Sequence, residues 1–148
     1  MMMTIRTVWT MFVAFWTTLF FSLAAIIGGL VGVKRGMFFD GCARYWSWTL
    51  LWASNVRVIV EGAENFEREQ PDIVVANHLS WFDIPALATS IPKRVRFVAK
   101  KELGFPIFGH AWKAAGHISI DRQDRASAIE SLSRAGEILR SDNSSVII

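Results

Sequence analysis

Two residues near the middle of the chain, His78 and Asp83, carry side chains that together could move a proton. An imidazole takes a proton from a hydroxyl group most readily when a carboxylate fixes its tautomer and stabilises the imidazolium that forms. Both follow an apolar, β-branched run at residues 73–76, which predicts a buried strand ending at a polar cluster. The pair indicates a general base and its orienting acid. By itself this spacing is a weak signal, and a hydrogen-bonded structural histidine is the alternative.

The residues around this pair strengthen the interpretation. The stretch Asn77-His78-Leu79-Ser80-Trp81-Phe82-Asp83-Ile84-Pro85 resembles the first motif, H-x4-D, of the glycerolipid (phospholipid/glycerol) acyltransferase family. A second block of that family is matched in order and spacing by Lys101-Glu102-Leu103, Pro106, Gly109, Gly116 and Ile120-Asp121-Arg122. The resemblance covers residues 56–148 and includes the bacterial members that acylate 1-acyl-glycerol-3-phosphate.

This resemblance implies an O-acyltransferase of phospholipid biosynthesis. His78 would act as the base and Asp83 would orient it, with no covalent enzyme intermediate. The acyl donor would be acyl-CoA or acyl-carrier protein, as a co-substrate and not a bound cofactor. The acceptor would be the sn-2 hydroxyl of lysophosphatidic acid, giving phosphatidic acid; another glycerol-phosphate or lysophospholipid acceptor is the alternative. Ser80 lies between the pair, but the pair suffices without a serine nucleophile.

An acceptor that carries a phosphate requires cationic side chains. Five basic residues lie close together in the sequence, at positions 93, 94, 96, 100 and 101. Lys101 and Arg122 match the family's second block, which is implicated in binding the acceptor's phosphate. Arginine offers a planar fork for phosphate and lysine a point charge. The remaining basic residues are expected on a solvated face or against anionic lipid.

Composition and charge limit the classes of partner that the chain is expected to bind. The net charge of +3 favours anionic surfaces, and membrane lipids fit the high apolar content of 52% better than a nucleic acid does. His110 and His117 show no zinc-ligand spacing with Cys42 or Asp83, so we predict structural histidines and no metal site. The single cysteine excludes an intramolecular disulfide.

The N-terminal part of the chain predicts a membrane anchor. No formally charged residue occurs within residues 7–33, a stretch long enough to cross a hydrocarbon core or to form one arm of a hairpin. Gly28 and Gly32 form a G-x-x-x-G pattern that would let another helix approach, or would merely loosen the helix end. Lys34 and Arg35 follow the stretch, which predicts that the rest of the chain lies in the cytoplasm. The resemblance to bacterial members implies the bacterial inner membrane.

A second apolar stretch, residues 37–54, predicts an interfacial helix packed on the first. Asp40 and Arg44 are spaced to pair on one helical face. Tryptophans at positions 46, 48 and 52 favour the membrane interface. A core helix of the soluble part is the alternative.

The remainder alternates between strand and helix patterns. Strands are predicted at residues 55–61, 73–76, 94–99, 118–120 and 145–148. Helices are predicted at residues 84–88, from about 106 to 115, and after a capping box formed by Ser127 and Glu130, with Ile129, Leu132, Gly136 and Leu139 on one face. The alternation predicts an α/β fold, a mixed sheet with flanking helices, preceded by the hydrophobic helical anchor.

We divide the chain into an anchoring segment, residues 1–54, and the N-terminal part of an acyltransferase domain, residues 55–148. The family's third and fourth blocks would follow residue 148, so we expect a shortened chain with an incomplete acceptor site. Residues 146–148 would then be an exposed apolar end. A non-catalytic membrane-bound module is the alternative of another class, and a small membrane protein unrelated to lipid synthesis would require both blocks to be coincidences.

Overall fold

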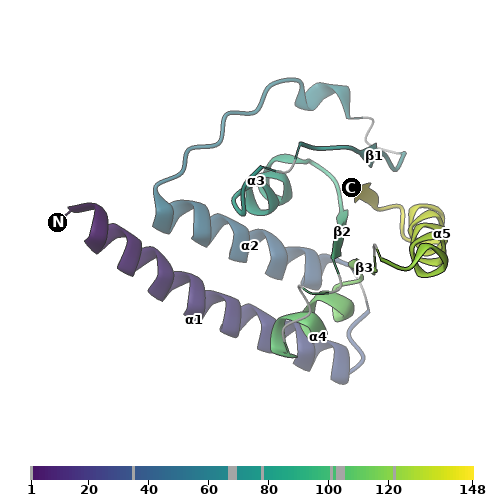
Figure 1. Ribbon diagram of the computed structural model, residues 1–148, viewed down its shortest axis with the longest axis horizontal. Coiled ribbons are helices and arrows are strands. Elements are labelled where there is room, and N and C mark those ends of the chain that lie inside the picture. The colour runs from purple at the N-terminus through teal and green to yellow at the C-terminus, as the bar shows by residue number, and fades with distance from the viewer. Residues whose placement is uncertain are drawn as a thin grey trace.

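The computed structural model describes residues 2–34, 36–66, 70–77, 79–100, 102, 106–121 and 123–148 (Figure 1). The described helices are α1 (Met2–Leu30), α2 (Met37–Ser54), the 3-10 helix η1 (Ala63–Asn65), α3 (Asp83–Ser90), α4 (Pro106–Ala114) and α5 (Arg125–Asp142). The described strands are β1 (Ile73–Val74), β2 (Val95–Lys100), β3 (Ile118–Ile120) and β4 (Ser145–Ile147). The predicted α/β class is confirmed.

The four described strands form one parallel sheet in the order β1-β4-β2-β3. Helix α5 covers one face, where Ala135 packs against Ile118 and Val146. Helices α3 and α4 cover the other face, with α1 and α2 outside them (Figure 1). Parallel sheets are stable when helices bury both faces, because the strands then have no solvated side.

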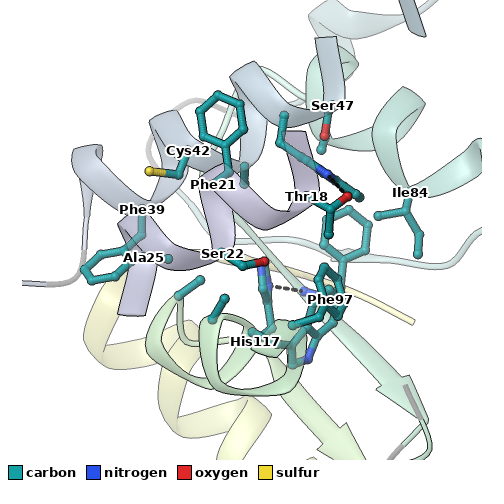
Figure 2. A pocket seen from close by; sticks show the side chains of 17 residues that line it. Thr18, Phe21, Ser22, Ala25, Phe39, Cys42, Ser47, Ile84, Phe97 and His117 are labelled. Carbon is teal, nitrogen blue, oxygen red and sulfur yellow. Dashed lines mark hydrogen bonds between the residues drawn. The ribbon is translucent and has the colours of Figure 1, made fainter. Parts of the chain in front are cut away.

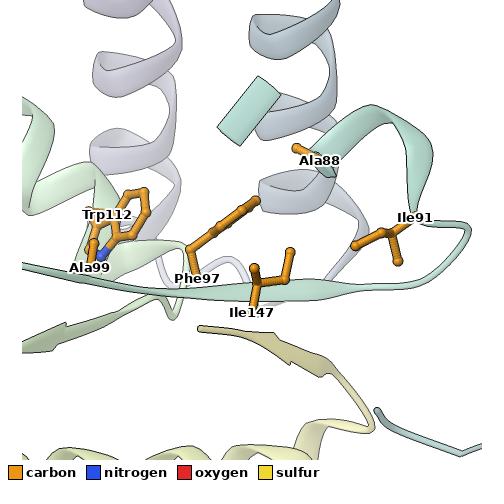
Figure 3. Packing of buried hydrophobic residues seen from close by; sticks show 6 residues of the cluster. All are labelled: Ala88, Ile91, Phe97, Ala99, Trp112 and Ile147. Atoms are coloured by element: carbon orange, nitrogen blue, oxygen red, sulfur yellow. The ribbon is translucent and has the colours of Figure 1, made fainter. Parts of the chain in front are cut away.

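The main core lies between β2 and the helices α3 and α4. Phe97 and Trp112 of α4 lie on the same side of β2, and their ring centroids are 6.2 Å apart (Figure 3). The buried members of this cluster are Ala88, Ile91, Phe97, Ala99, Trp112 and Ile147. Its side chains come from α3, β2, α4 and β4, so this core fixes the helix that follows the motif to the centre of the sheet.

Helices α1 and α2 form an antiparallel pair. At the open end of the pair, the Arg6 guanidinium donates to the Ser54 carbonyl at 3.2 Å. At the closed end the helices approach closely, because a Cβ added to Gly28 would lie 2.5 Å from the Phe38 ring. Gly32 has a φ of +77° and ends α1. The G-x-x-x-G pattern therefore serves a contact within this chain at Gly28 and a turn at Gly32.

The helix pair exposes a continuous row of aromatic rings. Neighbouring centroids are 6.2 to 6.5 Å apart along the row Trp48, Trp52, Trp9, Phe12 and Trp16. All five side chains are exposed. Among the described helices, α1 has the length and apolar composition of a membrane crossing, over Thr4–Leu30. These five rings form the aromatic row. Together with the apolar helix, they indicate membrane association.

Several predicted elements differ from those observed. Residues 55–61 form no strand. The strand before the motif is shorter than predicted and lies at the edge of the sheet, with Ile73 62% exposed. The expected exposed apolar end is wrong for Val146 and Ile147, because β4 inserts between β1 and β2 and buries them, whereas Ile148 is exposed. These three differences depend on the order of the strands in the sheet, which local sequence patterns do not encode.

Helix α5 also has a different N-terminal cap, and turns a different face to the sheet, from those predicted. Asp124, and not Ser127, caps the helix, since its carboxylate accepts the Ala126 backbone N–H at 2.9 Å. The face toward the sheet carries Ser131 and Ala135. Ile129 and Leu132 are exposed, and the side chain of Leu139 lies outside the described residues. The small side chains of Ser131 and Ala135 let α5 approach the sheet, and Ile138 supplies the larger apolar contact.

Candidate active site

The motif residues border a cleft at the carboxyl ends of the strands. Parallel α/β sheets place their ligand sites at this edge, because the loops that follow the strands converge there. The cleft has a volume of about 490 Å³. Its walls come from β2, β4, α3, α4 and the turn before α3, and are formed by Ala76, Leu79, Ser80, Trp81, Asp83, Ile84, Leu87, Phe97, Val98, Ala99, Lys100, Trp112, Ile147 and Ile148.

Asp83 is the first residue of α3 and holds the turn that precedes it. Its Oδ2 accepts the backbone N–H groups of Leu79 and Ser80, each at 2.7 Å. The Ser80 hydroxyl oxygen in turn accepts the Phe82 N–H at 3.1 Å. A carboxylate at a helix N-terminus is also favoured by the helix dipole. Asp83 therefore fixes the backbone directly after position 78.

His78, Lys101 and Arg122 lie outside the described residues, so their predicted roles stay predictions. The described residues next to them lie at one edge of the sheet. Lys100 ends β2 and lines the cleft. Asp121 follows β3, and its carboxylate accepts the Gln123 N–H at 3.0 Å across position 122. The three strands β1, β2 and β3 are parallel members of one sheet, so positions 78, 101 and 122 all follow strands at their carboxyl ends.

Three other basic residues of the run at positions 93–101 serve the fold, at the opposite end of β2. Arg96 is 1% exposed and donates to Asp40 of α2 at 2.6 Å. Arg94 lies 3.4 Å from the second oxygen of the same carboxylate. Lys93 pairs with Asp72. The expected solvated or lipid-facing role is therefore wrong for Arg96, since a buried cation needs a paired anion.

An apolar groove adjoins the cleft. It has a volume of about 720 Å³ and lies between α1, α2, α4 and the start of α3. Trp81, Ile84 and Trp112 line both the groove and the cleft. Further groove residues are Thr10, Ala14, Phe15, Thr18, Leu19, Ser22, Trp46, Leu50, Ser54, Phe82, Pro85, Ile107 and Phe108. The walls are almost wholly apolar, so the groove suits an alkyl chain.

A smaller pocket, of about 70 Å³, lies behind Phe97 and contains His117 (Figure 2). The His117 Nδ1 accepts the Phe97 backbone N–H at 3.2 Å, and its ring lies 4.2 Å from that of Trp112. Burial, and secondarily the nearby Arg96 cation, lower the pKa of His117 to about 3. The imidazole is thus neutral at physiological pH, as its acceptor role requires. The prediction of a structural histidine is confirmed at this position.

Sequence reasoning missed Trp112 as a site residue. Its side chain lines the cleft, the groove and the smaller pocket. The available signal was weak: a tryptophan within an amphipathic helical stretch between the two halves of the second motif block. The contact of Arg44 with the end of α3 was also missed, because its partners are backbone carbonyls, which no side-chain pattern reveals.

This arrangement defines a class of protein: an α/β domain with a turn closed by Asp83 at the carboxyl edge of its sheet, beside an apolar groove. The Acyltransferase family model matches residues 57–148. The match covers more than half of the chain, which therefore belongs to the acyltransferase family. No solved structure matches it.

Similar proteins share one name. A 1-acyl-sn-glycerol-3-phosphate acyltransferase of Cocos nucifera is 35% identical over 100 residues, 67% of this chain and 32% of that protein. The enzyme of that name from Helicobacter pylori is 38% identical over 76 residues, 51% of this chain and 32% of its own. The human alpha form is 38% identical over 85 residues, 57% of this chain and 30% of its own. The chain spans about a third of the length of these relatives. Since they come from a plant, a bacterium and an animal, they give no support for a specifically bacterial membrane.

Proposed function

We propose that this chain carries the acyl-transfer site of a 1-acylglycerol-3-phosphate O-acyltransferase. The observation that carries the proposal is the Asp83 carboxylate, which holds the turn after position 78 at the mouth of the cleft through two backbone N–H groups. The names of the similar proteins support the choice of lysophosphatidic acid as acceptor. The donor would be a thioester of coenzyme A or of acyl-carrier protein.

The chemistry needs one base and one thioester. The His78 imidazole takes the proton of the acceptor's sn-2 hydroxyl as its oxygen attacks the thioester carbonyl. The tetrahedral intermediate then collapses, the carbon–sulfur bond breaks, and the proton returns from the imidazolium to the departing thiolate. Asp83 stabilises that imidazolium and keeps the turn in place. Products are phosphatidic acid and the free thiol, so no redox partner or metal is needed to balance the step.

Lys101 and Arg122 are proposed to bind the acceptor's phosphate. Both positions follow strands of the parallel sheet at the edge that bears the cleft, and both match the family's second block. A cation at this edge would hold the phosphate while the sn-2 hydroxyl faces His78. Lys100, which lines the cleft, adds positive charge to the same region.

The apolar groove is proposed to hold an alkyl chain of the donor or acceptor. Its volume of about 720 Å³ falls within the range of roughly 300–1,000 Å³ that is usual for sites of small ligands. The aromatic row, whose five residues do not line the groove, would rest in the lipid interface. Because α1 also packs on α4, we propose that the helix pair lies along the membrane with the domain attached.

Residues 1–54 would thus be the anchoring segment and residues 55–148 the acyltransferase part. The cations at Lys34 and Arg35, just after the apolar stretch, favour the cytoplasmic side for the catalytic part. Protease accessibility in sealed vesicles tests this orientation: cleavage within residues 55–148 from the cytoplasmic face alone is expected.

The acceptor assignment is tested by a panel of acceptors with labelled acyl-CoA: lysophosphatidic acid, glycerol-3-phosphate and lysophosphatidylcholine. Preferred transfer to lysophosphatidic acid is expected. Arg122→Ala should raise the KM for that acceptor at least about tenfold, while its kcat changes little, if the guanidinium binds phosphate in the ground state. An unchanged KM would contradict the phosphate role, and preferred transfer to another acceptor would correct the substrate.

A further inference from the structure

Helix α3, which begins with Asp83, is held at its far end by an arginine of α2. The Nη2 of Arg44 donates to the carbonyl oxygen of Ile91 at 2.7 Å and to that of Lys93 at 3.1 Å. Ile91 is the residue that caps the C-terminus of α3. Carbonyl groups at a helix C-terminus have no partners within the helix, and the negative end of the helix dipole favours a cation there. Arg44 therefore serves as a C-terminal cap supplied by a neighbouring helix.

The expected ion pair between Asp40 and Arg44 does not form. Asp40 binds Arg96 of β2 instead, while Arg44 turns to the segment between α3 and β2. The two residues thus anchor α2 at separate points. Asp40 holds the central strand, and Arg44 holds the helix that bears the motif carboxylate.

Helix α3 is short, and it packs on α2 as well as contributing Ala88 to the main core. Its eight residues span about 12 Å. Among the described elements, α2 is its principal neighbour, as Figure 1 shows by their side-by-side course. A helix this short moves as a rigid body, so a shift at Ile91 is transmitted to Asp83. That carboxylate is bonded to the Leu79 and Ser80 N–H groups, and a displaced α3 strains both bonds.

We propose that Arg44 is a positioning residue: by capping α3 from α2, it sets the position of Asp83 and couples the helix pair to the motif turn. The effect of Arg44 on catalysis rests on the function proposed above, whereas its coupling to Asp83 through α3 does not. Since α2 carries two rings of the aromatic row, docking of the helix pair on a lipid surface would restrain α3 through the same guanidinium. Arg44 is exposed, so its bonds are accessible to disruption without opening the core.

Hydrogen exchange measured by mass spectrometry tests the link on the whole chain, in detergent and on anionic phospholipid vesicles. Arg44→Met keeps the apolar stem and removes the donors. Exchange in the peptide covering residues 83–91 should rise about three- to tenfold, because a partly exposed charge-assisted hydrogen bond contributes roughly that factor to an opening equilibrium. Peptides from β2 and α5 should be unchanged. Arg44→Lys, with one amine in place of the fork, should give intermediate exchange.

Arg134→Ala is the matched control, since it removes an exposed arginine from α5, on the other side of the sheet. It should leave α3 exchange at the wild-type level. Vesicles should slow α3 exchange in the wild type and fail to do so in Arg44→Met, although both sediment with the vesicles. Wild-type exchange in α3 for both Arg44 variants would overturn the proposal. Equal increases in α3, β2 and α5 would also overturn it, because they would indicate a general loss of stability.

Activity adds a readout that a purely structural role would not produce. Arg44→Met should lower kcat for acyl transfer while leaving the KM for lysophosphatidic acid within about twofold. If the wild-type chain transferred no acyl group, the proposed function would fail, yet the exchange experiment would still decide the link. If transfer occurred and Arg44→Met left both kcat and α3 exchange unchanged, the link alone would fail.

Discussion

The Oδ2 of Asp83 lies 2.7 Å from the backbone nitrogen of Ser80, inside the span of its own motif. The carboxylate therefore closes the turn that leads into α3. A second bond of equal length to the Leu79 nitrogen completes the closure. A carboxylate suits this position better than an amide because hydrogen bonds to a charged acceptor are the stronger ones.

Replacing Asp83 tests this relationship. Asp83→Asn keeps an oxygen that can accept both backbone N–H groups but removes the negative charge that would stabilise the imidazolium, so kcat/KM should fall by about 100-fold or more. Steady-state acyl transfer measures the loss. Thr49→Ala, at a distant position of α2, serves as the control. Activity of Asp83→Asn within threefold of wild type would contradict the role of the carboxylate.

His117 predicts a specific pH dependence of stability. Its folded pKa of about 3 lies below the usual value of 6.5, so the unfolded chain binds the proton that the folded chain refuses. The stabilising contribution is complete above about pH 6.5 and is lost as the pH falls from there toward 3. Between pH 7 and pH 5 the free energy of unfolding should drop by about 2 kcal/mol from this group alone.

Denaturant unfolding in detergent at the two pH values measures that drop. His117→Gln cannot titrate in this range, so its own change between pH 7 and pH 5 should be smaller than the wild type's by about the same 2 kcal/mol. His110→Gln provides a matched histidine control. Identical pH dependence in His117→Gln and wild type would show that the buried imidazole is not the source.

The buried pair of Asp40 and Arg96 should respond asymmetrically to substitution. Asp40→Ala leaves the Arg96 cation almost fully buried with its principal anion removed, which should lower the free energy of unfolding by about 3–5 kcal/mol. The double variant Asp40→Leu with Arg96→Met removes both charges and should recover most of that loss. The free energies of unfolding of the wild type, Asp40→Ala and the double variant are compared to test this. A double variant as unstable as Asp40→Ala would mean that α2 depends on the charges themselves.

The approach of α1 to α2 predicts a difference between two glycines. At Gly28 an added side chain meets the Phe38 ring, whereas at Gly41 there is nothing within 4 Å. Gly28→Val should therefore destabilise the chain by about 1 to 3 kcal/mol more than Gly41→Val does. Thermal unfolding in detergent measures the stability of the two variants. Equal effects would indicate that the helix pair separates freely at its closed end.

Local patterns predicted most elements of this chain. Residues 37–54 and 118–120 form the predicted helix and strand, and α3, β2, α4 and β4 differ from their predictions only at the ends. The motif placed Asp83 at the start of a helix, because a polar turn after an apolar strand leaves few alternatives. These features depend on neighbouring residues alone.

What the sequence did not predict depends on distant partners. The alternating residues 55–61 read as a strand, but no neighbouring strand in the sheet pairs with them. Arg96 belongs to a basic run that looked solvated, and its burial follows from an anion on another helix, Asp40. Similarly, Arg44 was expected to bind Asp40 and instead caps α3, because helix packing decides which groups come within reach.

The most direct test of the proposed function is transfer of a radiolabelled acyl group to lysophosphatidic acid by membranes that contain this chain. Acyl-CoA and acyl-carrier protein thioesters serve as donors, and His78→Ala is the comparison. The account predicts labelled phosphatidic acid with the wild type, none above background with His78→Ala, and equal membrane binding of both. Equal product from the two proteins, or none from either, would contradict it.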